Sequence, residues 1–133
     1  MTRYLLDTNV VIALLNNAES ALARRVRQHK PADVCISSIV SHELFYGAFK
    51  SQRAERNVAL VDNLQFEVLD FDKEDARQSG QIRAHLALNG TPIGPYDVLV
   101  AGQAKARNMI LVTGNTDEFK RVEGLVIENW GAH

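Results

Sequence analysis

Short apolar runs alternate along this chain with segments of helical periodicity, and this alternation limits the fold more than any other feature. The runs are Tyr4–Leu6, Val34–Ile36, Phe66–Leu69 and Met109–Val112, with a weaker one at Leu125–Ile127. They are brief and mostly unbroken by polar residues, as expected of parallel strands that helices cover on both faces. We therefore expect an α/β fold, a three-layer α/β/α sandwich with a mainly parallel sheet of four to five strands.

The segments between these runs have the apolar spacing of helices that pack against a sheet. The sequence contains no repeat, low-complexity tract or flexible linker. We therefore expect residues 1–133 to form a single domain, since this length is typical of one. The predicted helices lie around Val10–Leu14 and Leu22–Val26, over Ser41–Phe49 and Arg53–Leu64, over Lys73–Leu88 with Asn89-Gly90 as a left-handed cap, and from Pro95 to Arg107.

Composition excludes several classes of protein. Fifteen basic residues against sixteen acidic residues give a net charge of −1, so nucleic-acid binding would need a local basic patch. The single cysteine, Cys35, excludes an internal disulfide and a cysteine-based zinc site, and its apolar neighbours predict a core position. The early apolar run Val10–Leu15 is too short for a membrane span and lacks the features of a signal peptide. We expect a soluble, cytoplasmic protein with no membrane contact.

Acidic residues stand at or near the ends of several predicted strands. Asp7 follows the first strand, Glu43 lies on the helix after the second, and Asp97 opens the helix after Gly94-Pro95. Each has a local alternative: a helix cap for Asp7, an exposed helical side chain for Glu43, and a first-turn acid for Asp97. A fourth acidic group follows the fourth strand in the polar segment 113–118, which alone resembles an ordinary turn.

Taken together, the acids favour a metal site. A parallel sheet gathers the carboxyl ends of its strands at one edge, where carboxylates repel one another unless a cation compensates them. An all-oxygen site suits Mg²⁺ or Mn²⁺, which activates water and stabilises the charge of a phosphoryl transition state. The pattern indicates metal-assisted hydrolysis of a phosphodiester. The sequence contains no P-loop, GxGxxG motif or HExxH motif that would indicate other chemistry.

The order and spacing of these motifs resemble the PIN-domain ribonucleases, and in particular the VapC toxins of bacterial toxin–antitoxin pairs. The resemblance covers essentially the whole chain. The residues that carry it are Leu6-Asp7-Thr8-Asn9, Ile36-Ser37-Ser38, His42-Glu43-Leu44-Phe45-Tyr46-Gly47, Gly80-Gln81-Ile82-Arg83-Ala84, Pro92-Ile93-Gly94-Pro95-Tyr96-Asp97, Leu111-Val112-Thr113 and Asn115-Thr116-Asp117-Glu118-Phe119.

This resemblance implies a PIN fold and an endoribonuclease that depends on Mg²⁺, with Mn²⁺ as a substitute. Asp7, Glu43 and Asp97 match the family's acidic positions and are the expected metal ligands, Asp7 and Asp97 most directly. Related sequences carry the last acid at the position of Asn115 or Glu118. Because Asn115 cannot carry charge, we assign Glu118 as the fourth catalytic acid.

Further residues are expected to support the acids or bind RNA. The polar residues expected to orient the ligands are Thr8, Asn9, Thr113, Asn115 and Asp117, with Asp117 also the substitute for Glu118. The expected RNA contacts are Arg24, Arg25, Arg27, Lys50, Arg53 and Tyr96, with Tyr46 and Phe49 as further candidates for stacking on bases. The alternative is a solvated helix face for the basic residues and core packing for the aromatic ones.

The resemblance also implies partners and a biological role. VapC-like proteins are typically homodimers that bind a small VapB antitoxin, whose C-terminal segment blocks the site in a heterocomplex. The region around Ile93–Asp97 is similar to the subgroup that cuts initiator tRNA in the anticodon stem-loop, arresting translation and growth. Two alternatives remain from the sequence: a catalytically silent PIN-like protein that binds RNA or antitoxin, and a phosphoacceptor signalling module.

Overall fold

The computed structural model describes residues 2–131, whose central element is a five-stranded, wholly parallel sheet. The strand order is β3-β2-β1-β4-β5, so the first strand lies at the centre. This confirms the predicted fold class. The strands are β1 (Tyr4–Leu6), β2 (Val34–Ser37), β3 (Glu67–Leu69), β4 (Ile110–Val112) and β5 (Ile127–Glu128).

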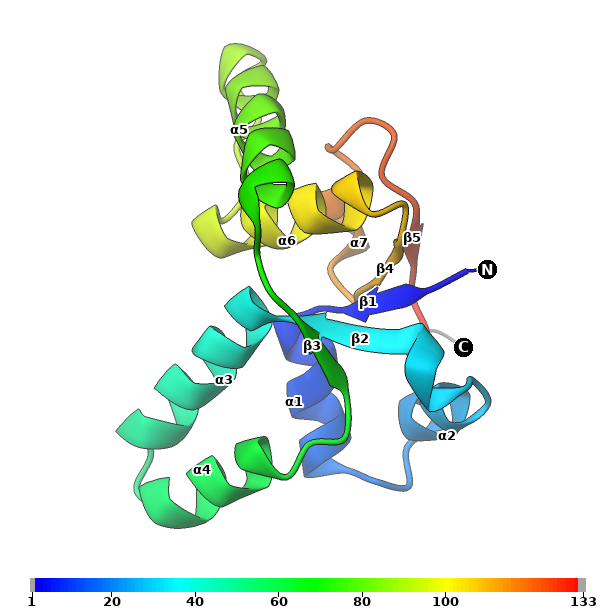
Figure 1. Cartoon of the computed structure of the whole chain (residues 1–133), viewed down its shortest axis with the longest axis vertical. Helices are drawn as coiled ribbons and strands as arrows, with labels where there is room; N and C mark the ends of the chain where they lie inside the picture. Colours follow the sequence, from blue (N-terminus) through cyan, green and yellow to red (C-terminus); the bar gives the residue numbers. More distant parts are fainter. Residues whose placement is uncertain (1, 132–133) are drawn as a thin grey trace.

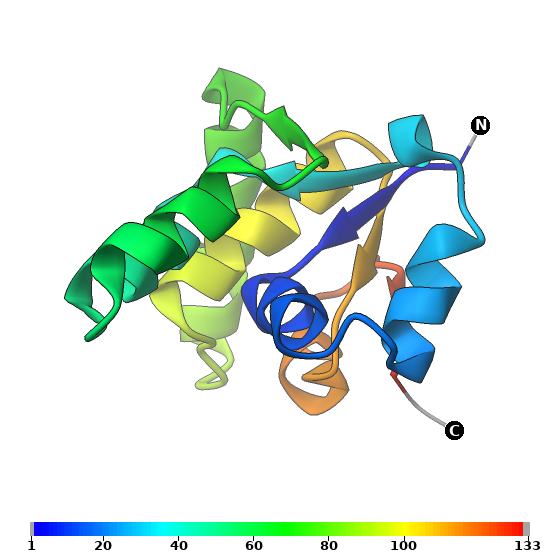
Figure 2. The same ribbon diagram turned by 90° about the horizontal axis from the view of Figure 1, so that it is seen from below.

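Helices cover both faces of this sheet (Figures 1 and 2). The helices α5 and α6 lie on one side, and α1 and α2 on the other, while α3 and α4 form a pair that projects beyond the end of the sheet. The helices are α1 (Thr8–Asn16), α2 (Ala21–Arg27), the short η1 (Pro31–Asp33), α3 (Ser38–Lys50), α4 (Ala54–Asp62), α5 (Lys73–Leu88), α6 (Pro95–Ala106) and α7 (Thr116–Phe119).

The apolar runs form the core because both faces of the central strands are covered. Leu5, Leu6, Leu111 and Val112 are fully buried, as is Cys35 on β2, which confirms the predicted core position of the cysteine. The register pairs Leu6 with Ile36 on one side and with Val112 on the other. The carboxyl ends of β1, β2 and β4 therefore end at the same level, and the residues that follow them meet at one edge.

The helices α5 and α6 approach each other closely because Gly102 has no side chain. A methyl group at that position would lie 2.0 Å from the Ser79 hydroxyl oxygen and 2.6 Å from the Ser79 backbone nitrogen. Ser79 itself is buried and donates a hydrogen bond to the carbonyl of Asp75 at 2.8 Å. This contact fixes α6, whose first turn carries Asp97.

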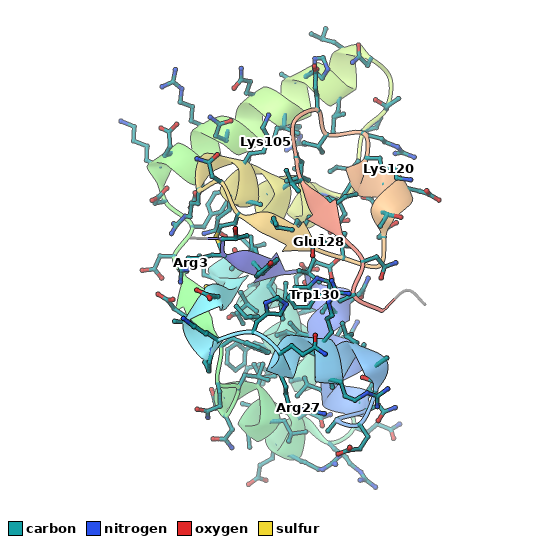
Figure 3. All side chains as sticks on the ribbon, turned by 90° about the vertical axis from the view of Figure 1, so that its right-hand side faces the viewer. Arg3, Arg27, Lys105, Lys120, Glu128 and Trp130 are labelled. Atoms are coloured by element: carbon teal, nitrogen blue, oxygen red, sulfur yellow. The ribbon has the colours of Figure 1, made fainter. Side chains whose placement is uncertain are left out.

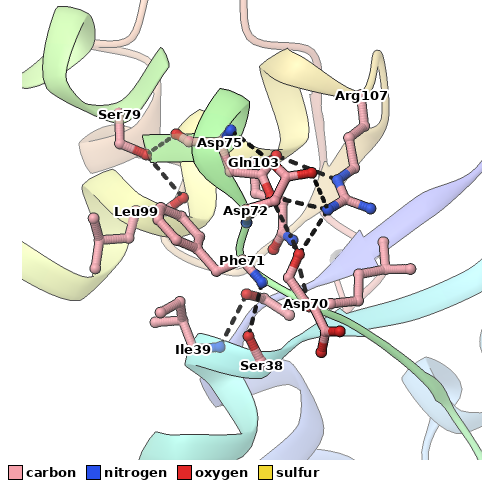
Figure 4. A network of polar contacts seen from close by, with 12 residues as sticks. Ser38, Ile39, Asp70, Phe71, Asp72, Asp75, Ser79, Leu99, Gln103 and Arg107 are labelled. Atoms are coloured by element: carbon pink, nitrogen blue, oxygen red, sulfur yellow. Dashed lines mark hydrogen bonds and ion pairs between the residues drawn. The ribbon is translucent and has the colours of Figure 1, made fainter. Parts of the chain in front are cut away.

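A partly buried polar network beside this contact joins the start of α5 to the end of α6 (Figure 4). Arg107 donates two hydrogen bonds to the carboxylate of Asp75, at 3.2 and 2.9 Å, and one to the carbonyl of Asp70 at 2.7 Å. The Gln103 amide adds donated bonds to Asp75 and to Asp70. Asp75 also completes a reciprocal capping box with Asp72 at the start of α5. We call Asp75, Gln103 and Arg107 the paired cluster.

Several boundaries differ from the sequence-based expectation. The segment 116–119, expected to be a plain polar loop, forms the short helix α7, and β5 lies at Ile127–Glu128 rather than at Leu125–Ile127. The helix α3 begins at Ser38, three residues earlier than expected, because Ser37 caps it by accepting the Ile39 N–H at 3.0 Å. Gly90 has a φ of 70°, which confirms the left-handed position after α5.

In the part of the chain that the structure describes, no helix combines the length and the apolar character that crossing a membrane requires.

Candidate active site

Asp7 lies where β1 ends, and its two carboxylate oxygens do different things. One oxygen caps α1 by accepting the Val10 N–H at 3.0 Å, and the other accepts the Thr113 hydroxyl at 2.5 Å. Thr113 follows β4 directly, one residue beyond the pairing of Leu6 with Val112. The helix-cap interpretation is therefore correct for one oxygen, while the second is held toward the residues that follow β4.

The side chain of Asp7 is 5% exposed, and its burial raises the pKa of the carboxyl above the ordinary value. The hydrogen bonds from Thr113 and Val10 act in the opposite direction, and the negative charge of Glu43 adds to the increase. Asp7 is thus a desolvated carboxylate with no basic partner, which is costly unless a cation approaches it.

Glu43 reaches the same edge from the second turn of α3. Its carboxylate accepts a hydrogen bond from the Thr8 hydroxyl at 2.8 Å, and Thr8 is the residue after Asp7. Glu43 is half-buried, so the alternative of a fully exposed helical side chain is wrong. The short segment after β1 therefore contributes one acid directly and orients a second.

Asp97 and Glu118 form the other half of the site. Glu118 accepts the Gly94 N–H at 2.8 Å and the Asn115 amide at 2.5 Å, which ties α7 to the start of α6. The carboxyl groups of Asp97 and Glu118 interact, and a hydrogen bond between them acts to raise the pKa of Asp97 and to lower that of Glu118. Burial, this bond and the charges of Glu118, Glu43 and Asp7 raise the pKa of Asp97 to about 7. The Gly94 N–H and the bonds from Asp97 and Asn115 hold the pKa of Glu118 below its ordinary value.

These four carboxylates gather at the carboxyl ends of the strands, and we call them the acidic edge. Among residues 2–131, no ion pair joins any of the four to a lysine, arginine or histidine. Each acid instead perturbs its neighbours, and Asp97 is affected by the charges of all three others. The members of the acidic edge are Asp7, Glu43, Asp97 and Glu118.

The chemistry of this donor set fits a hard divalent cation bound partly through water. Within residues 2–131, no three acidic, histidine or cysteine side chains lie close enough to bind one ion together directly. Mg²⁺ commonly takes only one or two carboxylates and keeps several waters. Burial first, and then the charges of neighbouring acids, raise the pKa values of Asp7 and Asp97, and a bound cation would offset both effects.

The remaining polar residues predicted at the site divide into two groups. Thr8, Thr113 and Asn115 each hydrogen-bond to an acid, as described above, and the Asn115 N–H also donates to the Thr113 hydroxyl at 2.9 Å. Asn9 contributes only its backbone N–H, which lowers the pKa of Asp7. Asp117 is exposed, so the structure places Glu118 rather than Asp117 among the acids.

The structure separates most of the predicted RNA contacts from the acidic edge. Arg24 and Arg27 on α2 donate to the carbonyls of Glu19 and Ala18, and Arg25 lies over the ring of Trp130 at 5.6 Å. Figure 3 shows Arg27 and Trp130 from the side where β1 begins, opposite the carboxyl ends of the strands. Lys50 and Arg53 are exposed where α3 is followed by α4, and Tyr96 alone of this set is adjacent to an acid in sequence.

Two residues beside the acids stand in the motifs of the sequence but were not among the predicted site residues. Gly94 holds Glu118 through its N–H, and a Cβ at this position would lie 2.9 Å from a carboxylate oxygen of Asp97. His42 contacts the ring of Tyr96, with ring centroids 5.6 Å apart. The Gly-Pro pair before the α6 helix was a usable signal for Gly94, whereas nothing in the sequence pairs His42 with Tyr96.

Comparison with known proteins agrees with this geometry. The PIN domain matches residues 4–125. The chain is 44% identical over 132 residues to the tRNA(fMet)-specific endonuclease VapC of Shigella flexneri, covering 98% of this chain and 99% of the relative. The corresponding Salmonella typhimurium protein is 45% identical with the same coverage. The chain belongs to the VapC family of PIN-domain ribonucleases. This membership argues against the phosphoacceptor alternative.

Solved structures of VapC-family complexes have the same fold. The DNA-bound VapBC of Salmonella typhimurium has a TM-score of 0.92 at 45% identity, covering 98% of this chain and 99% of that one. VapBC-1 of nontypeable Haemophilus influenzae has a TM-score of 0.90 at 34% identity, covering 98% and 100%. Nucleases with a PIN domain generally use a divalent metal, in accord with the donor set of the acidic edge.

Proposed function

We propose that this protein is the toxin of a VapBC-type pair and an endoribonuclease that cuts initiator tRNA in the anticodon stem-loop. The observation that carries the proposal is the acidic edge, four carboxylates from separate elements that form no ion pair among the described residues. The substrate is inferred from two relatives at 44% and 45% identity that are named for tRNA(fMet). Such cleavage would arrest translation and growth until an antitoxin binds.

We assign the roles of the site residues from their contacts. Asp7 and Asp97 would hold Mg²⁺, or Mn²⁺ as a substitute, with Glu43 and Glu118 binding its waters. When bound, the ion would supply charge stabilisation for the phosphoryl transition state. Thr113 and Thr8 keep Asp7 and Glu43 oriented through their hydroxyls. In the hydrolysis, the oxygen of water bonds to phosphorus as a carboxylate of the edge takes a proton from that water. One phosphorus–oxygen ester bond breaks, and the departing oxygen takes up a proton and leaves as the hydroxyl end of the other RNA fragment.

The experiment is cleavage of purified initiator tRNA, with elongator methionine tRNA as the comparison and mapping of the new 5′ ends. We expect one dominant cut in the anticodon stem-loop, loss of cutting with EDTA, and recovery with Mg²⁺ or Mn²⁺. Asp97→Asn should be inactive. Asp62→Asn, which changes an exposed acid at the end of α4, is the matched control and should cut normally. Intact RNA with wild-type protein and Mn²⁺ would favour the catalytically silent alternative.

We propose that the antitoxin lies in the apolar groove between α1 and the α3–α4 pair. This groove encloses about 350 Å³ and is lined by Leu15, Leu44, Leu60 and Glu43 among others. Because Glu43 lies at its rim, a segment in the groove reaches the acids and can place a basic side chain among them. Leu60 is 41% exposed, so Leu60→Glu should fold normally yet fail to co-purify with the antitoxin encoded beside it.

Three further properties belong to the same proposal. We propose that residues 1–133 act as one domain, that the protein is a homodimer, and that it acts in the cytoplasm where its tRNA substrate is found. Sedimentation of the isolated protein tests the oligomeric state, and a monomer at micromolar concentration would contradict it.

A further inference from the structure

Two aromatic rings flank the acidic edge, and each belongs to the residue immediately before an acid. Tyr96 precedes Asp97 at the start of α6, and His42 precedes Glu43 on α3. Their ring centroids lie 5.6 Å apart at an interplanar angle of 47°. Tyr96 is 45% exposed, so this pair presents ring surface to solvent beside the carboxylates.

The aromatic surface continues outward along α3. Tyr46 stands one helical turn after His42, on the same face of the helix, and is 61% exposed. The ammonium of Lys50, a further turn along, lies 4.7 Å from the centre of the Tyr46 ring. We call Tyr96, His42 and Tyr46 the aromatic row. From His42 to Lys50 this face of α3 extends roughly 12 Å.

The composition of the row fits unpaired RNA. Proteins bind single-stranded loops by stacking splayed bases on aromatic side chains, whereas bases within a duplex do not present their faces. A cation beside the rings is placed to offset backbone phosphate. The row begins at the acids, so a strand whose phosphate lies at the acidic edge has its neighbouring bases over these rings.

We propose that the aromatic row stacks the unpaired bases next to the scissile phosphate, with Tyr96 holding the base nearest to the cut. This rests on the proposed ribonuclease function and adds the reason why cutting is confined to loops. It explains exposed rings that the metal chemistry does not use. Tyr96 is then a substrate-binding residue whose loss raises KM more than it lowers kcat.

The test compares Tyr96→Ala with the conservative Tyr96→Phe on two forms of an anticodon stem-loop RNA. One form is intact, and the other lacks the base on one side of the mapped cut. With intact RNA, Tyr96→Ala should lower kcat/KM roughly tenfold to hundredfold, the range for loss of one stacked base. Tyr96→Phe keeps the ring and should stay within about twofold of wild type. Val126→Ala, an exposed apolar change beside β5, is the control for surface truncation and should have no effect.

The abasic RNA gives the decisive comparison. If the base stacks on Tyr96, removing the base should lower the kcat/KM of the wild-type protein by the same factor as Tyr96→Ala does on intact RNA. Removing the base should not lower the kcat/KM of Tyr96→Ala any further. If Tyr96→Ala lowers kcat/KM relative to wild type by the same factor on the intact and the abasic RNA, the proposal is overturned. The proposal is also overturned if Tyr96→Phe lowers kcat/KM as much as Tyr96→Ala does, because that result would indicate a role for the hydroxyl.

A binding measurement separates this proposal from the proposed function. In the Asp97→Asn background, adding Tyr96→Ala should weaken binding of the loop RNA roughly tenfold or more and leave binding of a duplex of the same sequence unchanged. If the wild-type protein cuts RNA but Tyr96→Ala does not weaken binding of the loop RNA, only the stacking proposal is overturned. Absence of cutting by wild type would contradict the ribonuclease function. Sedimentation of Tyr46→Ala completes the test. If this variant no longer forms a dimer, Tyr46 contacts a second copy of the chain, and the proposal is overturned for Tyr46.

Discussion

Asp75 in the paired cluster and Asp97 at the acidic edge are both carboxyl groups affected by burial, and their pKa values shift in opposite directions. In the paired cluster, burial acts to raise the pKa of Asp75, but the hydrogen bonds and charge of Arg107 outweigh it and hold the pKa below its ordinary value. At the acidic edge, burial and neighbouring acids raise the pKa of Asp97 to about 7. The difference is that Arg107 forms an ion pair with Asp75, whereas no such ion pair reaches Asp97 within the described residues 2–131.

The comparison separates a structural acid, Asp75, from the acids that we propose to be functional. The Asp75 carboxylate is neutralised inside the fold, where it joins the start of α5 to the end of α6. The acidic edge keeps its charge uncompensated, which destabilises the fold but leaves the site available for a cation and RNA phosphate. A perturbed carboxylate is therefore informative about function when its pKa is raised and its partners are other acids.

The largest expected effect is on activity. Asp7→Asn should lower the rate of RNA cleavage roughly 10²- to 10⁴-fold, because a metal-bound carboxylate supports several kcal/mol of transition-state stabilisation. Asparagine is an equally good helix cap and can still bond to Val10 and Thr113, so the melting temperature should not fall. Cleavage within tenfold of wild type would remove Asp7 from the site.

The corresponding change in the paired cluster should affect stability instead. Arg107→Met leaves the buried Asp75 carboxylate unpaired and should reduce the free energy of unfolding by about 3 kcal/mol, the low end for buried pairs because the guanidinium is partly exposed. Urea denaturation measures this loss. Adding Asp75→Asn removes the buried charge and should recover part of the lost free energy of unfolding. If the single and double variants are equally stable, the pairing of Arg107 with Asp75 is contradicted.

A smaller change should disturb the acidic edge by geometry alone. Gly94→Ala places a methyl group 2.9 Å from the Asp97 carboxylate and 3.5 Å from that of Glu118. We expect roughly a tenfold loss of cleavage, as one carboxylate is displaced while the fold is kept. Gly80→Ala on α5, where a methyl group would meet nothing within 4 Å, is the matched control and should cut normally.

The smallest effect is the dependence of stability on pH. Because the folded-state pKa of Asp97 is about 7 and its ordinary value is 3.8, the folded state binds more protons than the unfolded state between these pH values. Without metal, stability should therefore fall as pH rises from 4 to 7, and the melting temperature should fall with it. Asp97→Asn should flatten this slope, whereas Arg107→Met should not. A melting temperature that rises from pH 4 to pH 7 in the wild-type protein and in Arg107→Met would contradict the raised pKa of Asp97.

The sequence alone determined the fold class and the positions of the first four strands, because short apolar runs that alternate with amphipathic helices are typical of a parallel sheet covered on both faces. It also indicated Asp7 and Asp97, since a residue after a parallel strand or at a helix start has a fixed place relative to the sheet. The helix α7 was missed, because a four-residue helix has too little periodicity to distinguish it from a turn.

Only the tertiary structure decided which of the polar residues act together. The choice of Glu118 over Asp117 depends on the backbone N–H of Gly94, which lies 24 residues away along the chain. The separation of the α2 arginines from the acids, and the contact of His42 with Tyr96, likewise depend on how helices pack. Local sequence sets the character of each side chain, whereas pKa values and contacts arise from neighbours that are distant in the chain, and folding alone brings these together.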